Sequence, residues 1–183
     1  RMREAIGEVR RLWKGERVRR RNGVGKESDG CVHPRPIQAD VPVWVTSSRD
    51  KQTFVMAGEL GAGLLTHLIG HTIEELAEKI EAYREAWRRS GRPGRGHVTL
   101  MLHTFVGENR ERAQELGRGP LKAYIRTSYD LMADLGAARS VDMRDLPAEE
   151  VESLLERGFE RFFAQTGLLG GVGDVAATMA SLE

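Results

Sequence analysis

Polar side chains follow two neighbouring apolar segments of the sequence, where strands are expected to end. Thr46, Ser47 and Ser48 come directly after VPVWV, and Thr66 and His67 come directly after GLL. Hydroxyl groups, together with the first free amides of a following helix, suit a phosphate monoester. Serine and threonine are also favoured helix caps. The local pattern therefore predicts either plain capping or a phosphate-binding turn after the first segment, and either a structural or a ligand-binding role for His67.

The elements that must position these side chains alternate between strand and helix from residue 41 to residue 106. VPVWVTS is short and apolar on both faces, which is typical of a strand covered on both sides, and GLLTHL and HVTLMLHTFVG predict two further strands. Helices are predicted over residues 50–60 and after Thr72, which forms a capping box with Glu75. Helices between buried strands indicate right-handed parallel crossovers. Ligand sites in such sheets lie at the carboxyl ends of the strands.

The segments before residue 41 are predicted to form a helix and then a less regular region. REAIGEVRRLWKG has apolar residues at spacings of three and four, so an amphipathic helix is predicted over residues 1–14, stopped by Gly15. Residues 15–40 contain two strong turn signals, Asn22-Gly23 and Asp29-Gly30. They predict an irregular excursion or a short polar hairpin.

After Gly107 the chain is predicted to be all helical. A short helix covers residues 109–117, and Pro120, which is tolerated in a first turn, opens the next helix. Pro147 opens a third helix that Gly167 ends, and a last helix runs to the end of the chain.

Composition and charge favour a soluble globular protein of the cytoplasm. The 183 residues are 40% hydrophobic and 30% charged, with a net charge of +1. This charge gives no global attraction to nucleic acid or to acidic membranes. The single cysteine, Cys31, cannot form an internal disulfide, and no apolar run approaches the roughly 18 residues of a membrane span. The basic run over residues 10–21 is better explained as a solvated surface than as a nucleic-acid site.

Several other kinds of site find no support in the sequence. GELGAG at residues 58–63 has the wrong glycine order for a dinucleotide loop and leads from helix to strand, so helix termination explains it. His33, His71 and His97 show no HxxxH or HxH spacing among themselves, and no metal site is predicted. His103 is placed in or near the end of the third strand, with either a structural or a ligand-binding role. No G-x-S-x-G motif is present, so nucleophilic hydrolysis is not predicted, and catalytic residues stay unassigned.

Taken together, residues 1 to about 178 resemble the C-terminal half of a luciferase-like flavin monooxygenase. The segments that carry the resemblance are REAIGEVRRLWKGERV, PRPIQADVPVWVT, TFVMAGELGAGLLTHLIG and RGHVTLMLHTFVGE, together with the helix order after them. Within this family the chain looks most like the subgroup associated with nonribosomal peptide and polyketide biosynthesis. The resemblance implies a (β/α)8 barrel that binds reduced FMN and uses dioxygen to oxygenate a small-molecule or carrier-bound substrate. It also implies a flavin reductase as partner, and no nucleic-acid or membrane partner.

The resemblance also implies which residues hold the cofactor. In the family, the polar turn after the fifth strand helps to hold the flavin phosphate, and in this sequence that turn is Thr46-Ser47-Ser48, with Thr53 close behind. Thr66 and His67 are then expected at the rim of the sixth strand, facing the same pocket. With the resemblance, phosphate binding is favoured over plain capping, although one serine could do both.

The same comparison predicts an incomplete barrel. Three strands are recognised, which would be strands 5–7, whereas a closed barrel takes eight strands and about 250 residues. The fold class expected is therefore α/β, a partial TIM-type (β/α)8 barrel lacking strands 1–4 and 8, as one incomplete domain over residues 1–183. We expect the chain alone to lack monooxygenase activity. Two alternatives stay open: a deazaflavin-dependent oxidoreductase of the same barrel, or a non-catalytic module whose open sheet edges assemble with a partner or with a second copy.

Overall fold

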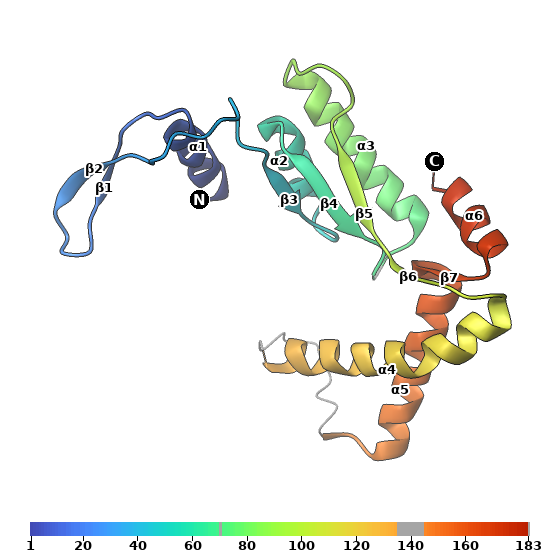
Figure 1. Cartoon of the computed structure of the whole chain (residues 1–183). Helices are drawn as coiled ribbons and strands as arrows, with labels where there is room; N and C mark the ends of the chain where they lie inside the picture. The colour runs from blue at the N-terminus through green and yellow to red at the C-terminus, as the bar shows by residue number, and fades with distance from the viewer. Residues whose placement is uncertain (70, 135–144, 183) are drawn as a thin grey trace. The chain divides into compact units, whose positions relative to one another are not determined.

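The structure of the protein is a computed structural model, and it describes residues 1–69, 71–134 and 145–182. The chain divides into two compact units, whose elements are labelled in Figure 1. The first unit comprises Arg1–Thr66 and Ala77–Thr99, and the second comprises His67–Leu76 and Leu100–Glu183. The single domain expected over the whole chain stays a prediction.

A helix and a β-hairpin begin the first unit. α1 (Met2–Trp13) is the predicted amphipathic helix, and Gly15 follows it with φ of 85°, a left-handed conformation that favours glycine. β1 (Val18–Arg21) and β2 (Glu27–Gly30) pair antiparallel, with Val18 opposite Gly30. The polar hairpin, one of the two structures predicted for residues 15–40, is thus confirmed.

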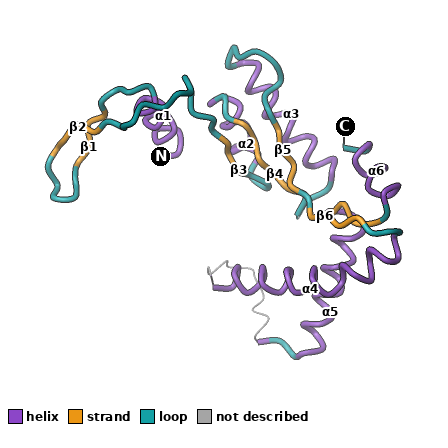
Figure 2. The backbone as a smooth tube through the Cα atoms, in the orientation of Figure 1, coloured by secondary structure: helices purple, strands orange, loops and turns teal. Residues whose placement is uncertain are grey.

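The predicted alternation of strands and helices is present. β3 (Trp44–Thr46), β4 (Gly63–His67) and β5 (Val98–Met101) form a three-stranded sheet in that order, and β3 pairs with β4 in parallel. Figure 2 shows α2 (Lys51–Leu60) connecting β3 to β4 and α3 (Ile73–Arg89) connecting β4 to β5. The parallel pairing brings the carboxyl ends of β3 and β4 to the same edge of the sheet.

One face of β3 is covered, and the other is open. Val45 and Leu64 pair in register and are 3% and 0% exposed, whereas Trp44, on the other face of β3, is 47% exposed. The prediction that VPVWV is covered on both faces is therefore wrong. A single layer of helices explains the difference: a Cβ placed on Gly58 of α2 would lie 2.4 Å from the carbonyl oxygen of Tyr83 in α3, so the two helices pack side by side.

Tyr83 of α3 forms hydrogen bonds with the residues that precede β4 and β5, at the amino-terminal edge of the sheet. Its side chain is fully buried, and its hydroxyl donates a hydrogen bond to the Ala62 carbonyl at 3.0 Å. The same hydroxyl accepts a hydrogen bond from the His97 amide at 3.1 Å. Burial raises the pKa of Tyr83, so the phenol stays neutral and keeps its donor.

The second unit contains a parallel pair of short strands that the sequence analysis did not recognise as such. β6 (His103–Val106) pairs in parallel with β7 (Gly167–Gly170). The predicted third strand, HVTLMLHTFVG, is therefore two strands, β5 and β6, that belong to different sheets. The prediction that residues 107–183 are all helical is also wrong. GLLG is too short to show a strand periodicity, and its partner strand lies far earlier in the chain.

The helices of the second unit pack into one apolar core. α4 (Arg110–Asp134) is a single helix with Pro120 inside it, where two helices were predicted. A proline removes one backbone donor, and here the buried Leu121 and Ile125 hold the helix together by packing in one cluster with Leu155 and Phe159 of α5 (Ala148–Arg161). A π-helical turn, β7 and α6 (Val172–Ala180) complete the unit. No helix within the described residues is long and apolar enough to cross a bilayer.

Candidate functional site

Three of the predicted cofactor residues gather where β3 ends and α2 begins. We call Ser47, Ser48 and Thr53 the hydroxyl cluster. The Ser47 amide donates to the Leu65 carbonyl at 3.1 Å, which fixes the turn against β4. The Ser47 hydroxyl lies 3.4 Å from the Asp50 carbonyl oxygen, a long hydrogen bond. The cluster thus lies at the carboxyl end of a parallel strand, where α/β proteins bind ligands.

Asp50 is the N-cap of α2, and the sequence analysis did not assign it to the site. Its carboxylate accepts hydrogen bonds from the amides of Gln52 at 3.1 Å and Thr53 at 3.2 Å. The Thr53 hydroxyl donates to the same carboxylate at 2.6 Å. These bonds, the one from the Thr53 hydroxyl first, lower the pKa of Asp50, so the group is a carboxylate at neutral pH. The available signal was aspartate three residues before a threonine at a helix start, an N-cap pattern.

Lys79 adds a cation to the same edge. It extends from α3, and its Nζ donates a hydrogen bond to the Ser48 carbonyl at 3.0 Å. Its side chain is half-buried. No local pattern could have assigned Lys79 to the site, because 31 residues separate it from Ser48 and only the packing of α3 brings them together.

Thr46 and Thr66 lie apart from the hydroxyl cluster's polar contacts. Thr46 is exposed and pairs in register with Leu65, so it lies on the open face of the sheet. Thr66 is 1% exposed, and its hydroxyl has no hydrogen-bond partner within the described residues. Burial alternates along β4, with Leu64 and Thr66 buried and Leu65 and His67 half-exposed. Successive strand residues point to opposite faces, so the expectation that Thr66 and His67 face the same pocket is not met.

His67 belongs to the second unit and interacts locally there. Its Nδ1 accepts a hydrogen bond from the Ile69 amide at 3.1 Å. Its ring stacks with that of His71, with 6.2 Å between the ring centroids. The two histidines are four residues apart, which is an HxxxH spacing that the sequence analysis overlooked when it set His71 aside. In the described part of the chain, no group of three or more His, Cys, Asp or Glu side chains has the geometry to hold a metal ion.

His103 has an aromatic environment in the second unit. Its ring centroid lies 4.6 Å from that of Tyr124 and 5.0 Å from that of Phe162. Burial lowers the pKa of His103, which favours the neutral imidazole. These contacts support the structural role, one of the two that the sequence left open for this residue.

A family model described as luciferase-like monooxygenase matches residues 1–183. The comparison with curated proteins finds no match.

Solved structures share the fold of the chain. The monooxygenase RslO1 from Streptomyces bottropensis is 19% identical with a TM-score of 0.62, covering 98% of this chain and 48% of that one. The oxygenating constituent of 3,6-diketocamphane monooxygenase from Pseudomonas putida, in complex with FMN, is 18% identical with a TM-score of 0.61, covering 98% and 52%. The coenzyme F420-dependent tetrahydromethanopterin reductase from Methanopyrus kandleri is 15% identical with a TM-score of 0.68, covering 99% and 53%.

At these identities the likeness shows the fold alone. That fold is an α/β arrangement with parallel sheets, as in the solved relatives. The chain spans about half the length of each of these structures.

Proposed function

The chain belongs to the luciferase-like monooxygenase family, and from this premise we propose that it forms part of a monooxygenase that uses reduced FMN and dioxygen. Its substrate is a small organic molecule or a carrier-tethered biosynthetic intermediate, and a flavin reductase supplies the reduced cofactor. In this proposal β3, β4 and β5 are strands 5–7 of a (β/α)8 barrel. When bound, the flavin supplies the electrons that activate dioxygen.

The observation that carries the proposal is the donor set at the start of α2. Ser47, whose hydroxyl forms only a long and weak bond, and Ser48 offer hydroxyl groups at the carboxyl edge of the sheet, and Lys79 offers one positive charge and the N–H donors that its bond to the Ser48 carbonyl leaves over. The single hydroxyl donor of Thr53 is already given to the Asp50 carboxylate. A phosphate monoester has several acceptor oxygens and a negative charge, and it fits such a set. In this role the protein holds and orients the cofactor.

Asp50 sets a condition on this fit. Its carboxylate already accepts from the Gln52 and Thr53 amides, so the free amides expected at this helix start are occupied by an internal anion. A phosphate must therefore bind through the hydroxyls and Lys79 beside Asp50, or displace the carboxylate. Ser47, Ser48 and Lys79 are the residues that can bind the phosphate while the Asp50 carboxylate stays in place.

A deazaflavin coenzyme is the second candidate. The fold is shared with a coenzyme F420-dependent tetrahydromethanopterin reductase, at a TM-score of 0.68. Coenzyme F420 also carries phosphate, so the same donor set suits it. Comparing the binding of the two cofactors to the chain separates the candidates.

The test compares FMN with riboflavin, which lacks the phosphate. We expect Lys79→Gln to weaken FMN binding about tenfold by equilibrium dialysis and to leave riboflavin binding unchanged, because only the phosphate meets the ammonium group. Lys26→Gln, in the turn of the hairpin, is the control for loss of one positive charge and should change neither affinity. Equal weakening of both ligands, or no binding of FMN at millimolar concentration, would contradict the proposed phosphate site.

A further inference from the structure

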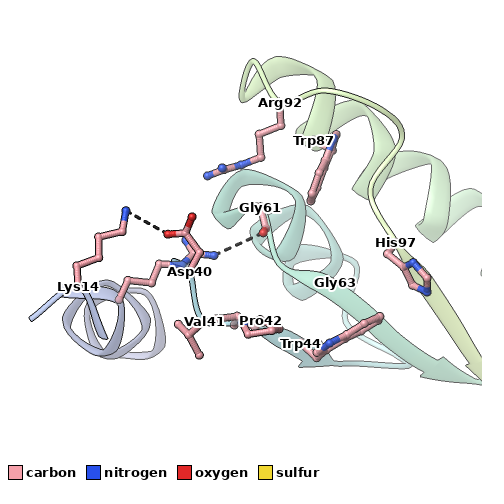
Figure 3. A pocket seen from close by; sticks show the side chains of 12 residues that line it. Lys14, Asp40, Val41, Pro42, Trp44, Gly61, Gly63, Trp87, Arg92 and His97 are labelled. Atoms are coloured by element: carbon pink, nitrogen blue, oxygen red, sulfur yellow. Dashed lines mark hydrogen bonds and ion pairs between the residues drawn. The ribbon is translucent and has the colours of Figure 1, made fainter. Parts of the chain in front are cut away.

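A cavity lies at the opposite edge of the sheet, where β3 and β4 begin. It has a volume of about 590 Å3, and Figure 3 shows the side chains that line it. Small-ligand sites commonly enclose about 300–1,000 Å3. All its lining residues belong to the first unit. It is distinct from the hydroxyl cluster, which lies at the other end of the same strands.

Aromatic side chains form one part of the cavity wall. Trp44 is 47% exposed, and its ring meets that of His97 edge to face, with 5.0 Å between centroids. The indole nitrogen of Trp87 donates to the Pro93 carbonyl at 3.0 Å, which fixes the orientation of a second indole. A Cβ on Gly63 would lie 2.5 Å from the Trp44 ring, so only glycine lets the Trp44 indole lie over this strand. These rings offer flat apolar surfaces for a planar ligand.

Two guanidinium groups form another part of the wall. Arg10 of α1 donates to the Leu60 carbonyl at 2.8 Å, and Arg92 donates to the same carbonyl at 3.2 Å. Neither has a carboxylate within 4.0 Å among the described residues, whereas Lys14 is paired with Asp40 at 3.1 Å. A guanidinium carries five N–H donors, so most donors of Arg10 and Arg92 remain free of protein acceptors.

This lining combines planar apolar surfaces with an uncompensated pair of cations. We propose that the cavity binds a small aromatic carboxylate of one or two fused rings. The ring system lies against Trp44 and Trp87, and the carboxylate accepts hydrogen bonds from Arg10 and Arg92, a pairing that arginine makes in bidentate form. The site is independent of the cofactor, because none of the residues of the hydroxyl cluster lines it.

The experiment uses two probes of equal shape and different charge. Isothermal titration calorimetry of the full chain measures the binding of 2-naphthoate and of 2-naphthamide. We expect naphthoate to bind at least tenfold more tightly than the neutral amide. Arg92→Gln and Arg10→Gln should each lower naphthoate affinity about tenfold and leave naphthamide affinity unchanged. Trp44→Leu should weaken both probes, because it removes ring contact.

The matched control is Arg11→Gln, which removes an equal charge from the same helix. Arg11 pairs with Glu16 at 2.7 Å and does not line the cavity, so naphthoate affinity should stay unchanged. Circular dichroism of each variant verifies folding. Equal affinity for the two probes, equal losses in the Arg11 and Arg92 variants, or no naphthoate binding at millimolar concentration would each overturn the proposal.

Discussion

The two ends of α2 are both held by charged side chains, but these come from different distances along the chain. At the amino end, the Asp50 carboxylate accepts from the amides of Gln52 and Thr53, two and three residues away. At the carboxyl end, Arg10 and Arg92 donate to the Leu60 carbonyl across 50 and 32 residues. Each sign matches the helix dipole, which favours anions at the amino end and cations at the carboxyl end.

The difference determines what a ligand meets at each end. At the amino end the helix amides already have an anion, so an incoming phosphate competes with Asp50. At the carboxyl end the cations are shared with a neutral carbonyl and have no carboxylate partner in the described chain, so an incoming anion adds to the contacts there. α2 thus has an internally neutralised end and an end with excess positive charge.

The largest expected effect comes from disrupting the contact between α2 and α3. The ligand sites at both ends of α2 depend on this contact. In Gly58→Val, the side chain would overlap the Tyr83 carbonyl and the Ala86 Cβ, which lie 2.4 and 2.9 Å from a Cβ at this position. We expect the free energy of unfolding, measured by urea titration, to fall by about 3 kcal/mol. Binding of both FMN and naphthoate should weaken in the same variant.

Gly7→Val is the control for this change. Gly7 also lies in a helix, but a Cβ there would meet nothing within 4 Å. Its effect should stay within about 0.5 kcal/mol, the range of helix propensity. Similar losses in the two variants would show that the contact between α2 and α3 is not close-packed.

The same contrast between local and distant contacts explains which features the sequence could predict. The order of α1, β3, α2, β4, α3 and β5 follows from apolar periodicity and caps, and the Thr72–Glu75 capping box is confirmed by hydrogen bonds in both directions. Thr46, Ser47 and Ser48, with Thr53 close behind, were predicted as one polar turn because they follow one strand closely, and the family resemblance assigned that turn to the cofactor phosphate. These features depend on neighbours within a few residues.

The sequence analysis missed or wrongly predicted the features that depend on tertiary contact. Lys79 reaches the site only because α3 packs beside α2, and β7 is a strand only because β6 pairs with it. The open face of β3 depends on which layers cover the sheet, which an apolar run of residues does not encode. Thr66 was assigned to the cofactor site from its position near a strand end, although its side chain lies on the buried face.

Thr66→Val compares the buried and open faces of the sheet at its carboxyl edge, with a smaller expected effect on the free energy of unfolding. The buried Thr66 hydroxyl has no hydrogen-bond partner among the described residues, and valine has nearly the same shape. We expect the free energy of unfolding to rise by about 1 kcal/mol, because the desolvation cost of an unpaired hydroxyl disappears. Thr46→Val, on the open face, should change it by less than about 0.5 kcal/mol. Lower stability in Thr66→Val, or weaker FMN binding, would show that the hydroxyl has a partner.

The smallest expected effect comes from removing the negative charge of Asp50, the internal anion at the amino end of α2. Asp50→Asn keeps an N-cap acceptor and removes the charge. On the proposed function, FMN affinity should rise about threefold to fivefold while riboflavin affinity stays constant, since only the phosphate is repelled by the carboxylate. A loss of FMN affinity would instead show that the carboxylate supports the phosphate turn.

The acid dependence of stability provides an independent measurement on the same pair of proteins. Hydrogen bonds from the Thr53 hydroxyl and the Gln52 amide lower the pKa of Asp50, so its carboxylate stabilises the folded chain above its ordinary pKa of 3.8. This stabilisation is lost as the pH falls through the lower pKa of the folded state. The thermal midpoint of the unsubstituted chain should therefore fall more steeply in acid than that of Asp50→Asn. Parallel curves would mean that the carboxylate forms no stronger hydrogen bonds in the folded chain than in the unfolded one, and that the amino end of α2 is open to an external anion after all.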